Sequence, residues 1–180
     1  MINPQTVPLS LYIHLPWCTR KCPYCDFNSH EGFTDSLQQP YVEALLADLD
    51  SQQGWWHDRP IHSIFIGGGT PSLFEGHWLG SLIEGISIRA HLSRDVEITL
   101  ESNPGSAERD RFAKYHAAGV NRLSIGVQSF DDRALKTLGR IHSGDDARRA
   151  LDMADAAGFQ RWNIDLMHGL PGQDAQSAAS

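Results

Sequence analysis

The sequence predicts an α/β fold in which parallel strands alternate with helices. Three observations predict it: short apolar runs alternate with helical periods, one helix-to-strand junction occurs twice, and Gly-rich or polar motifs follow the apolar runs. Strands joined in this way form either a (β/α) barrel or a doubly wound sheet, and both arrangements stay open here. In a barrel, the active site lies at the carboxyl ends of the strands.

Five short apolar runs are expected to be the strands. They are bounded by Gly, Pro or Asn, as is typical of strands that are buried on both faces. The expected strands are Leu9–Leu15, Ile61–Ile66, Val96–Leu100, Arg122–Val127 and Trp162–Met167.

Helical periods fill the segments between these runs. Apolar residues from Val42 to Leu49 recur at i, i+3, i+4 and i+7 after Pro40, a residue that favours the start of a helix. The residues from Leu79 to Ile86 repeat this spacing. Three more helices are expected because Ser and Asp cap helix starts and Gly ends helices. They run from Ser106 to Gly119, from Asp131 to Gly139 and from Asp145 to Gly158.

One junction between a helix and a strand is repeated along the chain. The segment from Ala117 to Ile125 aligns with the segment from Ala156 to Ile164, and in both an Ala-Ala-Gly helix end leads through Arg into a strand. Asp165 stands where the first copy has Gly126, so a polar group occupies the equivalent strand end. The repeat indicates a helix-then-strand unit, as barrels and doubly wound sheets contain.

Composition indicates one ordinary globular domain. The chain has 180 residues, of which 41% are hydrophobic and 21% charged. The net charge of −7 disfavours a nucleic-acid partner. No apolar stretch approaches the roughly 20 residues of a membrane span. The N-terminal residues lack the basic region of a secretory signal, so we expect a cytoplasmic location with reduced cysteines.

All three cysteines lie within eight residues, as Cys18-x3-Cys22-x2-Cys25, directly after the first expected strand. Three thiolates on one loop can hold three corners of a cubic iron–sulfur cluster and leave the fourth iron open for a small molecule. The alternative is a structural zinc site with His14 or His30 as fourth ligand. A disulfide would leave one thiol over, and nothing in the chain indicates secretion.

Every expected strand is followed by an unusual motif. These motifs are the cysteine loop, the Gly67–Ser72 run, the segment Glu101–Pro104, the segment Gly126–Ser129, and Asp165 with the segment Met167–Gly172. Packing does not explain five such features at one edge of a sheet. Their convergence predicts an active site there.

Each side chain at this edge has a chemical and a plainer interpretation. The Gly run brings a ligand close to the backbone or only makes a turn. Glu101 accepts from hydroxyls or an amine, or it is a solvated strand end. Gln128 pairs with a ribose or adenine edge, or it is a buried amide. Arg140 clasps a carboxylate or lies on the surface.

Three aromatic or imidazole side chains surround the cysteines. His14 is expected to pack or to orient the cysteine loop rather than to ligate a metal ion. Trp17 and Tyr24 flank the cysteines, where they shield a cluster or offer a stacking face.

These motifs resemble those of the radical S-adenosylmethionine (SAM) superfamily, in which C-x3-C-x2-C follows a first strand and GGGTP a second. More closely, YIHLPWCTRKCPYCDFNSH, IFIGGGTPS, NRLSIGVQSF, LGRIH and NIDLMHGLPGQ resemble the oxygen-independent coproporphyrinogen III oxidase family over essentially the whole chain. The resemblance implies a radical SAM core over residues 1–180. That core is a partial (β/α)6 barrel with about five βα units, cut before the last unit, with the family's C-terminal domain absent.

The resemblance also implies roles for individual residues. The three cysteines would hold a [4Fe–4S] cluster whose open iron binds SAM. The positions that contact this SAM match Tyr12, Gly68 and Glu101. The positions that hold a second SAM in the oxidase match Tyr24, Gly69, Thr70, Gln128, Arg140 and Asp165.

Phe27 departs from the oxidase pattern, which has a further cysteine at this position. The departure favours the HemW-like heme chaperone branch, whose members carry heme to target proteins. The alternative is a coproporphyrinogen III oxidase of porphyrin biosynthesis. The expected partners are heme, recipient hemoproteins, some of them membrane-associated, and an electron donor for the cluster.

Overall fold

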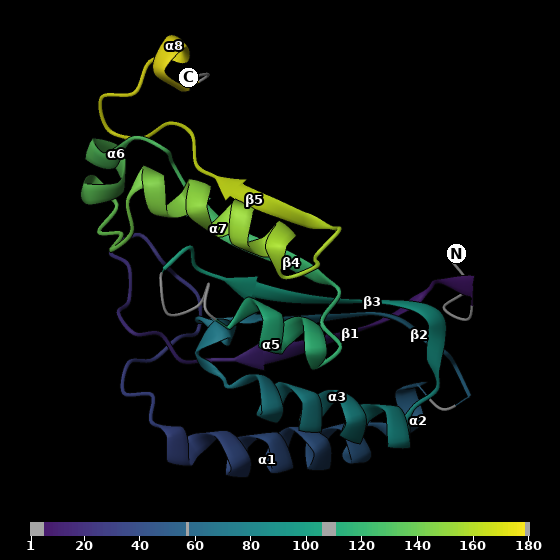
Figure 1. Ribbon diagram of the computed structural model, residues 1–180. Coiled ribbons are helices and arrows are strands. Elements are labelled where there is room, and N and C mark those ends of the chain that lie inside the picture. Colours follow the sequence, from purple (N-terminus) through teal and green to yellow (C-terminus); the bar gives the residue numbers. More distant parts are fainter. Residues whose placement is uncertain (1–5, 57, 106–110, 179–180) are drawn as a thin grey trace.

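The computed structural model describes residues 6–56, 58–105 and 111–178. Strands and helices alternate along this chain, as the sequence predicted (Figure 1). The strands are β1 (Leu9–Leu15), β2 (Ile61–Gly68), β3 (Leu92–Ser102), β4 (Arg122–Gln128) and β5 (Trp162–Leu166). The α-helices are α1 (Gln38–Ser51), α2 (Gln53–Trp56), α3 (Gly76–Arg89), α5 (Phe112–Ala117), α6 (Asp132–Thr137), α7 (Gly144–Ala156) and α8 (Ala175–Ala178). Two short 3-10 turns cover Asp35–Leu37 and Pro71–Leu73.

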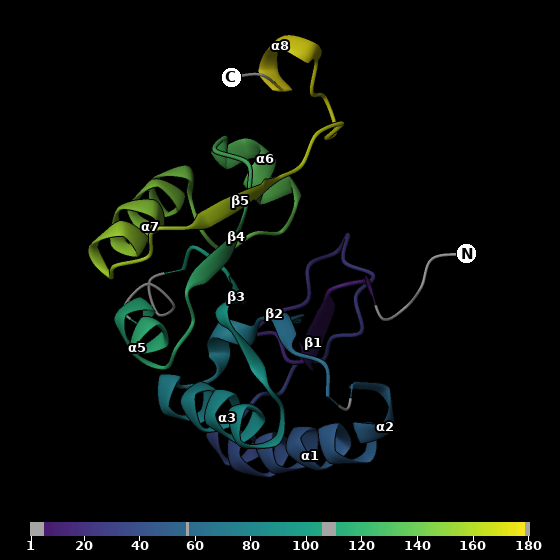
Figure 2. The same cartoon turned by 90° about the vertical axis from the view of Figure 1, so that its right-hand side faces the viewer.

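The five strands form one parallel sheet in the order β1-β2-β3-β4-β5. The strand order never reverses, and α1, α3, α5 and α7 lie along the outer side of the curved sheet (Figure 2). A doubly wound sheet would have helices on both faces and a reversal of strand order. The barrel-type alternative is therefore the one that the chain adopts.

Strand pairing brings alternating rows of side chains to opposite faces of the sheet. One row aligns Ile13, Ile66, Leu100, Leu123 and Trp162 across the five strands. Its first four members are buried on the outer face. The neighbouring row faces the concave side, because successive side chains of a strand point to opposite faces.

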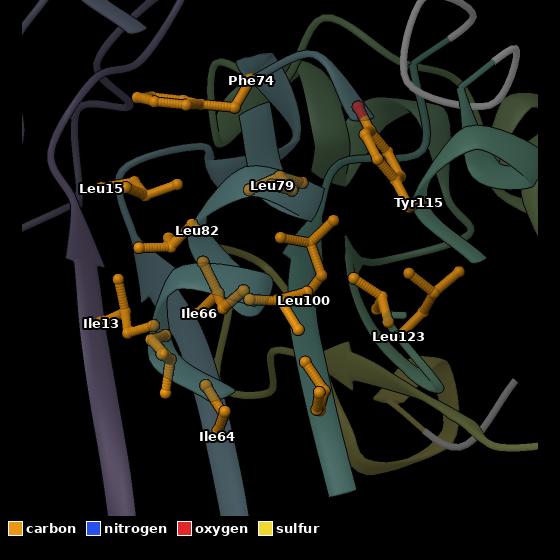
Figure 3. Close-up of a cluster of buried hydrophobic side chains, with 14 of the residues drawn as sticks. Ile13, Leu15, Ile64, Ile66, Phe74, Leu79, Leu82, Leu100, Tyr115 and Leu123 are labelled. Carbon is orange, nitrogen blue, oxygen red and sulfur yellow. The ribbon is translucent and has the colours of Figure 1, made fainter. Parts of the chain in front are cut away.

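The hydrophobic core lies between the outer face of the sheet and the helices. Ile66 and Leu100 pack there with Leu79 and Leu82 of α3, and Tyr115 of α5 closes one end of the cluster (Figure 3). All five side chains are essentially inaccessible to solvent. Burying one such side chain contributes about 1.5–3 kcal/mol, so this layer holds the strand ends in place.

Two expectations about burial and capping are wrong. The strands bury apolar side chains on the outer face only, and on β5 both Trp162 and Leu166 are exposed, to 37% and 56%. Helix α7 is capped by Ser143 rather than Asp145, because Ser143 and Asp146 bond reciprocally to each other's backbone N–H. The expected cap at Ser106 lies outside the described residues.

The other expected helix ends are confirmed. The Asp131 side chain accepts from the Arg133 N–H at 2.8 Å at the start of α6. Gly119, Gly139 and Gly158 follow α5, α6 and α7 with φ of 102°, 72° and 94°, a region that favours glycine.

Candidate functional site

The cysteine loop leaves β1 and returns beside its own start. A parallel bridge joins Trp17 to His30, with Cys18 N–H donating to the His30 carbonyl at 2.8 Å and His30 N–H to the Pro16 carbonyl at 2.7 Å. His14 Nε2 donates to the Asn28 carbonyl at 2.8 Å. The bridge closes the loop at its base, and His14 orients its far side as expected.

The three cysteines are free thiols at different depths. Cys18 is buried, whereas Cys22 and Cys25 are partly exposed. Within the described residues, no three His, Cys, Asp or Glu side chains converge to hold one metal ion. Both ring nitrogens of His14 are engaged, because Nδ1 also lies 2.9 Å from the Tyr12 hydroxyl. His14 therefore has no free nitrogen with which to ligate zinc.

The Gly run after β2 packs directly against the start of the cysteine loop. Gly69 N–H donates to the Leu15 carbonyl at 2.9 Å, and Thr70 N–H donates to the Trp17 carbonyl at 2.7 Å. A Cβ on Gly69 would lie 2.5 Å from the Trp17 carbonyl oxygen. Gly68 has φ of 125°, and a Cβ there would meet the Leu15 carbonyl and the His14 ring. Glycine is thus required for contact between two backbones, a reason that the sequence did not reveal.

Glu101 lies at the carboxyl end of β3 and faces the Gly run. Its Oε2 accepts from Gly68 N–H at 3.0 Å. Burial raises the pKa of the Glu101 carboxyl and the Asp165 charge adds to the rise, whereas the Gly68 bond and His14 oppose it. The solvated-strand-end interpretation is therefore wrong, since this carboxylate is half-buried and hydrogen-bonded.

Gln128 ends β4 in an unusual backbone conformation. Its φ is 68°, and Ser129 N–H donates to the Val127 carbonyl at 2.9 Å, which defines a γ-turn centred on Gln128. This form of γ-turn is rare and strained for a residue with a side chain. Strained residues of this kind gather at binding sites. The Gln128 side chain lines the cavity described below.

Arg140, just after α6, joins the ends of four strands into one polar network. Its Nη2 donates to Asn103 Oδ1 at 2.5 Å and to the Gly126 carbonyl at 2.7 Å. Its Nη1 lies 3.6 Å from Cys22 Sγ. Asn103 Nδ2 in turn donates to Thr70 Oγ1 at 3.2 Å. Arg140 is therefore not a surface charge, and Asn103 is a site residue that only the Glu101–Pro104 motif indicated.

A second network lies on the concave face between β4 and β5. Ser124 Oγ donates to Asp165 Oδ2 at 3.2 Å, and Asn163 Nδ2 donates to Asp165 Oδ1 at 3.1 Å. Arg122 Nη2 donates to Asn163 Oδ1 at 2.7 Å. Sequence reasoning identified Asp165 but missed Arg122, Ser124 and Asn163, whose only signal is their alternation with apolar residues along β4 and β5.

These groups surround one cavity of about 660 Å³ on the concave face. The expected site residues that line it are the three cysteines with Tyr24, Gly68, Gly69, Thr70, Glu101, Gln128, Arg140 and Asp165. Phe27 also lines it and is 59% exposed.

Two aromatic residues near the cysteines do not line the cavity. Tyr12 lies at its margin, where the ring stacks on the lining residue Phe65 at 6.3 Å between centroids. Trp17 instead packs edge-on against Tyr41, with ring centroids 4.6 Å apart, and also contacts Phe74. Of the two flanking aromatics, Tyr24 is the one available to a ligand.

The model of the radical SAM superfamily matches residues 12–179. The chain belongs to the radical SAM superfamily. This radical SAM chain is 53% identical over 171 residues to the heme chaperone HemW of Escherichia coli and 48% identical over 179 residues to that of Haemophilus influenzae. The alignments cover 95% and 97% of the chain, which spans 45% and 47% of those relatives.

A solved radical SAM enzyme shares the fold. The coproporphyrinogen III oxidase HemN of Escherichia coli superposes with a TM-score of 0.85 at 30% identity, covering 98% of this chain and 41% of that one. The barrel-type sheet is therefore that of a radical SAM core. None of the helices in the described residues is long and apolar enough to cross a membrane.

Proposed function

We propose that Cys18, Cys22 and Cys25 hold a [4Fe–4S] cluster and that the adjoining cavity binds SAM. Membership of the radical SAM superfamily supports this, together with three free thiols on one closed loop. The cavity of about 660 Å³ falls within the roughly 300–1,000 Å³ range of small-molecule sites. The donor set fits the cluster, because thiolates are its usual ligands.

The residues around the cavity suit the polar groups of SAM. Tyr12, Gly68 and Glu101 would contact it, with the Glu101 carboxylate accepting from an ammonium or hydroxyl group. A second molecule would meet Tyr24, Gly69, Thr70, Gln128, Arg140 and Asp165. When bound, the cluster and SAM supply one-electron chemistry, and the residues of the chain bind and orient the cofactor.

The cluster proposal is tested by anaerobic reconstitution followed by iron and sulfide analysis. Alanine at Cys18, Cys22 or Cys25 is expected to abolish cluster formation, whereas Thr19→Ala, a change of an exposed residue on the same loop, is expected to leave it intact. Wild-type iron and sulfide in all three cysteine variants would show that the cysteines are not the ligands. Stoichiometric zinc in the wild-type protein would restore the structural-site alternative.

We infer that the full-length protein is a heme chaperone that binds heme and delivers it to hemoproteins. The observation that carries this inference is Phe27, an exposed apolar side chain in the cavity where the oxidases have cysteine. The 53% identity to HemW supports it. The expected partners remain recipient hemoproteins, some membrane-associated, and an electron donor, and the expected location is cytoplasmic.

The alternative function is oxidation of coproporphyrinogen III, which the close superposition on HemN favours. The chaperone and oxidase functions are distinguished by incubating the reduced full-length protein anaerobically with coproporphyrinogen III and SAM. We expect no protoporphyrinogen from the wild-type protein, and saturable heme binding in a parallel titration. Formation of protoporphyrinogen would overturn the chaperone assignment.

A further inference from the structure

The guanidinium of Arg140 is aimed at one particular cysteine. Its Nη1 lies 3.6 Å from Cys22 Sγ, within hydrogen-bond range for sulfur. The other amino group, Nη2, is already committed to Asn103 Oδ1 and the Gly126 carbonyl. The two acceptors fix the plane of the guanidinium, so the direction of Nη1 towards the sulfur is built into the fold.

The backbone at Gly139 also packs closely against the ring of Pro23. Gly139 ends α6 with φ of 72°, and a Cβ at this position would lie 2.8 Å from Pro23 Cδ in the cysteine loop. The turn that carries Arg140 therefore rests directly on the loop beside Cys22.

A cation that donates to a cluster sulfur favours the reduced cluster, which carries one more negative charge. Hydrogen bonds to the sulfurs are among the features that set the reduction potentials of iron–sulfur clusters. Within the described residues, Arg140 has no carboxylate among its hydrogen-bond partners, so its charge is not cancelled by an ion pair.

We propose that Arg140 tunes the iron–sulfur cluster by donating a hydrogen bond to its ligand Cys22, which raises the reduction potential of the cluster. The proposal rests on the proposed cluster and goes beyond it. It assigns to Arg140 a role towards the cluster that is separate from any contact with SAM. In this role Arg140 is a positioning residue, because it acts through Cys22.

The experiment measures the midpoint potential of the reconstituted cluster by EPR-monitored redox titration, without SAM. Arg140→Gln is expected to shift the reduction equilibrium at least tenfold towards the oxidised form, which for one electron is about 59 mV more negative. Arg140→Lys keeps the charge but loses the planar fork and is expected to give a smaller shift. Iron and sulfide analysis of each protein reports separately whether the cluster forms.

Arg20→Gln is the matched control. Arg20 lies on the same loop between two cysteines and is exposed, and no hydrogen bond from it to a sulfur is present in the described residues. We expect the Arg20 variant to stay near the wild-type potential. Equal shifts in the Arg20 and Arg140 variants would show a bulk charge effect and overturn the proposal, as would an unchanged potential in Arg140→Gln. If Arg140→Gln fails to load iron, an Arg140→Lys potential equal to wild type overturns it. If the wild-type protein itself forms no cluster, the proposed cluster-binding function is overturned instead.

Discussion

Gly69→Ala tests the packing of the Gly run against the cysteine loop. The added Cβ would lie 2.5 Å from the Trp17 carbonyl oxygen, 2.8 Å from the Trp17 carbonyl carbon and 2.9 Å from the Pro16 carbonyl carbon. All three atoms belong to the backbone, so no side-chain rotation relieves the contact. The start of the cysteine loop must therefore move away from β2.

The free-energy cost follows from what that movement breaks. Gly69 N–H to Leu15 O, at 2.9 Å, and Thr70 N–H to Trp17 O, at 2.7 Å, are the two hydrogen bonds at the contact. Each contributes about 0.5–1.5 kcal/mol, and overpacking of a filled site costs about 1–3 kcal/mol. Because the loop can relax partly, we expect the free energy of unfolding to fall by about 2–4 kcal/mol.

Urea unfolding of the cluster-free chain measures this loss. Gly80→Ala is the control, since a Cβ at Gly80 in the middle of α3 meets Ala118 Cβ at an ordinary 3.6 Å. Alanine has the higher helix propensity, so this variant is expected to gain up to about 1 kcal/mol. If the free energy of unfolding of Gly69→Ala equalled that of the wild type, or rose as in Gly80→Ala, the backbone-contact explanation of the Gly run would be refuted.

Four further variants address the cap of α7, the half-buried carboxyl of Glu101 and the sheet edge. Ser143→Ala is expected to lower the free energy of unfolding by about 0.5–2 kcal/mol, and Asp145→Ala by less than about 0.5 kcal/mol. Thermal or urea unfolding measures both losses, and equal losses would contradict the assignment of Ser143 as the cap. Glu101 has a raised pKa in the folded state, so its charge opposes folding above that pKa and ceases to do so below the ordinary value of 4.5. Glu101→Gln is therefore expected to stabilise the chain at pH 7 relative to wild type, with the difference shrinking as the pH falls, and a difference independent of pH would contradict this. In the described residues β5 pairs only with β4 and exposes Leu166, so we expect the chain to associate through this edge. Leu166→Lys is expected to reduce association in sedimentation experiments. A monomeric wild-type chain would contradict this expectation.

The strands and their shared edge were predictable because both depend on short-range patterns. Segments such as Leu9–Leu15 are rich in apolar residues and bounded by Pro, and those bounds are reproduced in β1. Parallel strands place their carboxyl ends together, so the cysteine loop, Glu101, Gln128 and Asp165 meet at one cavity.

The partners of those residues were not predictable, because they depend on register between strands. Asn163 reaches Arg122, and Asp165 reaches Ser124, only through the alignment of β4 with β5. The cap of α7 was missed because Ser143 and Asp145 are both good capping residues, and only the backbone shows which one precedes the first turn. Trp17 was expected beside the cluster because it precedes Cys18 in the sequence, whereas its ring packs against Tyr41.

The order of the strands across the sheet is also the order in which a ribosome makes them. Each new strand finds its partner already synthesised, and pairing between neighbours in sequence keeps the entropy cost of loop closure low. The pairing of β2 with β1 also completes the contacts of Gly69 and Thr70 with the cysteine loop. We therefore expect the cysteine loop to fold with the first βαβ unit, and its amides to gain exchange protection together with those of β1 and β2.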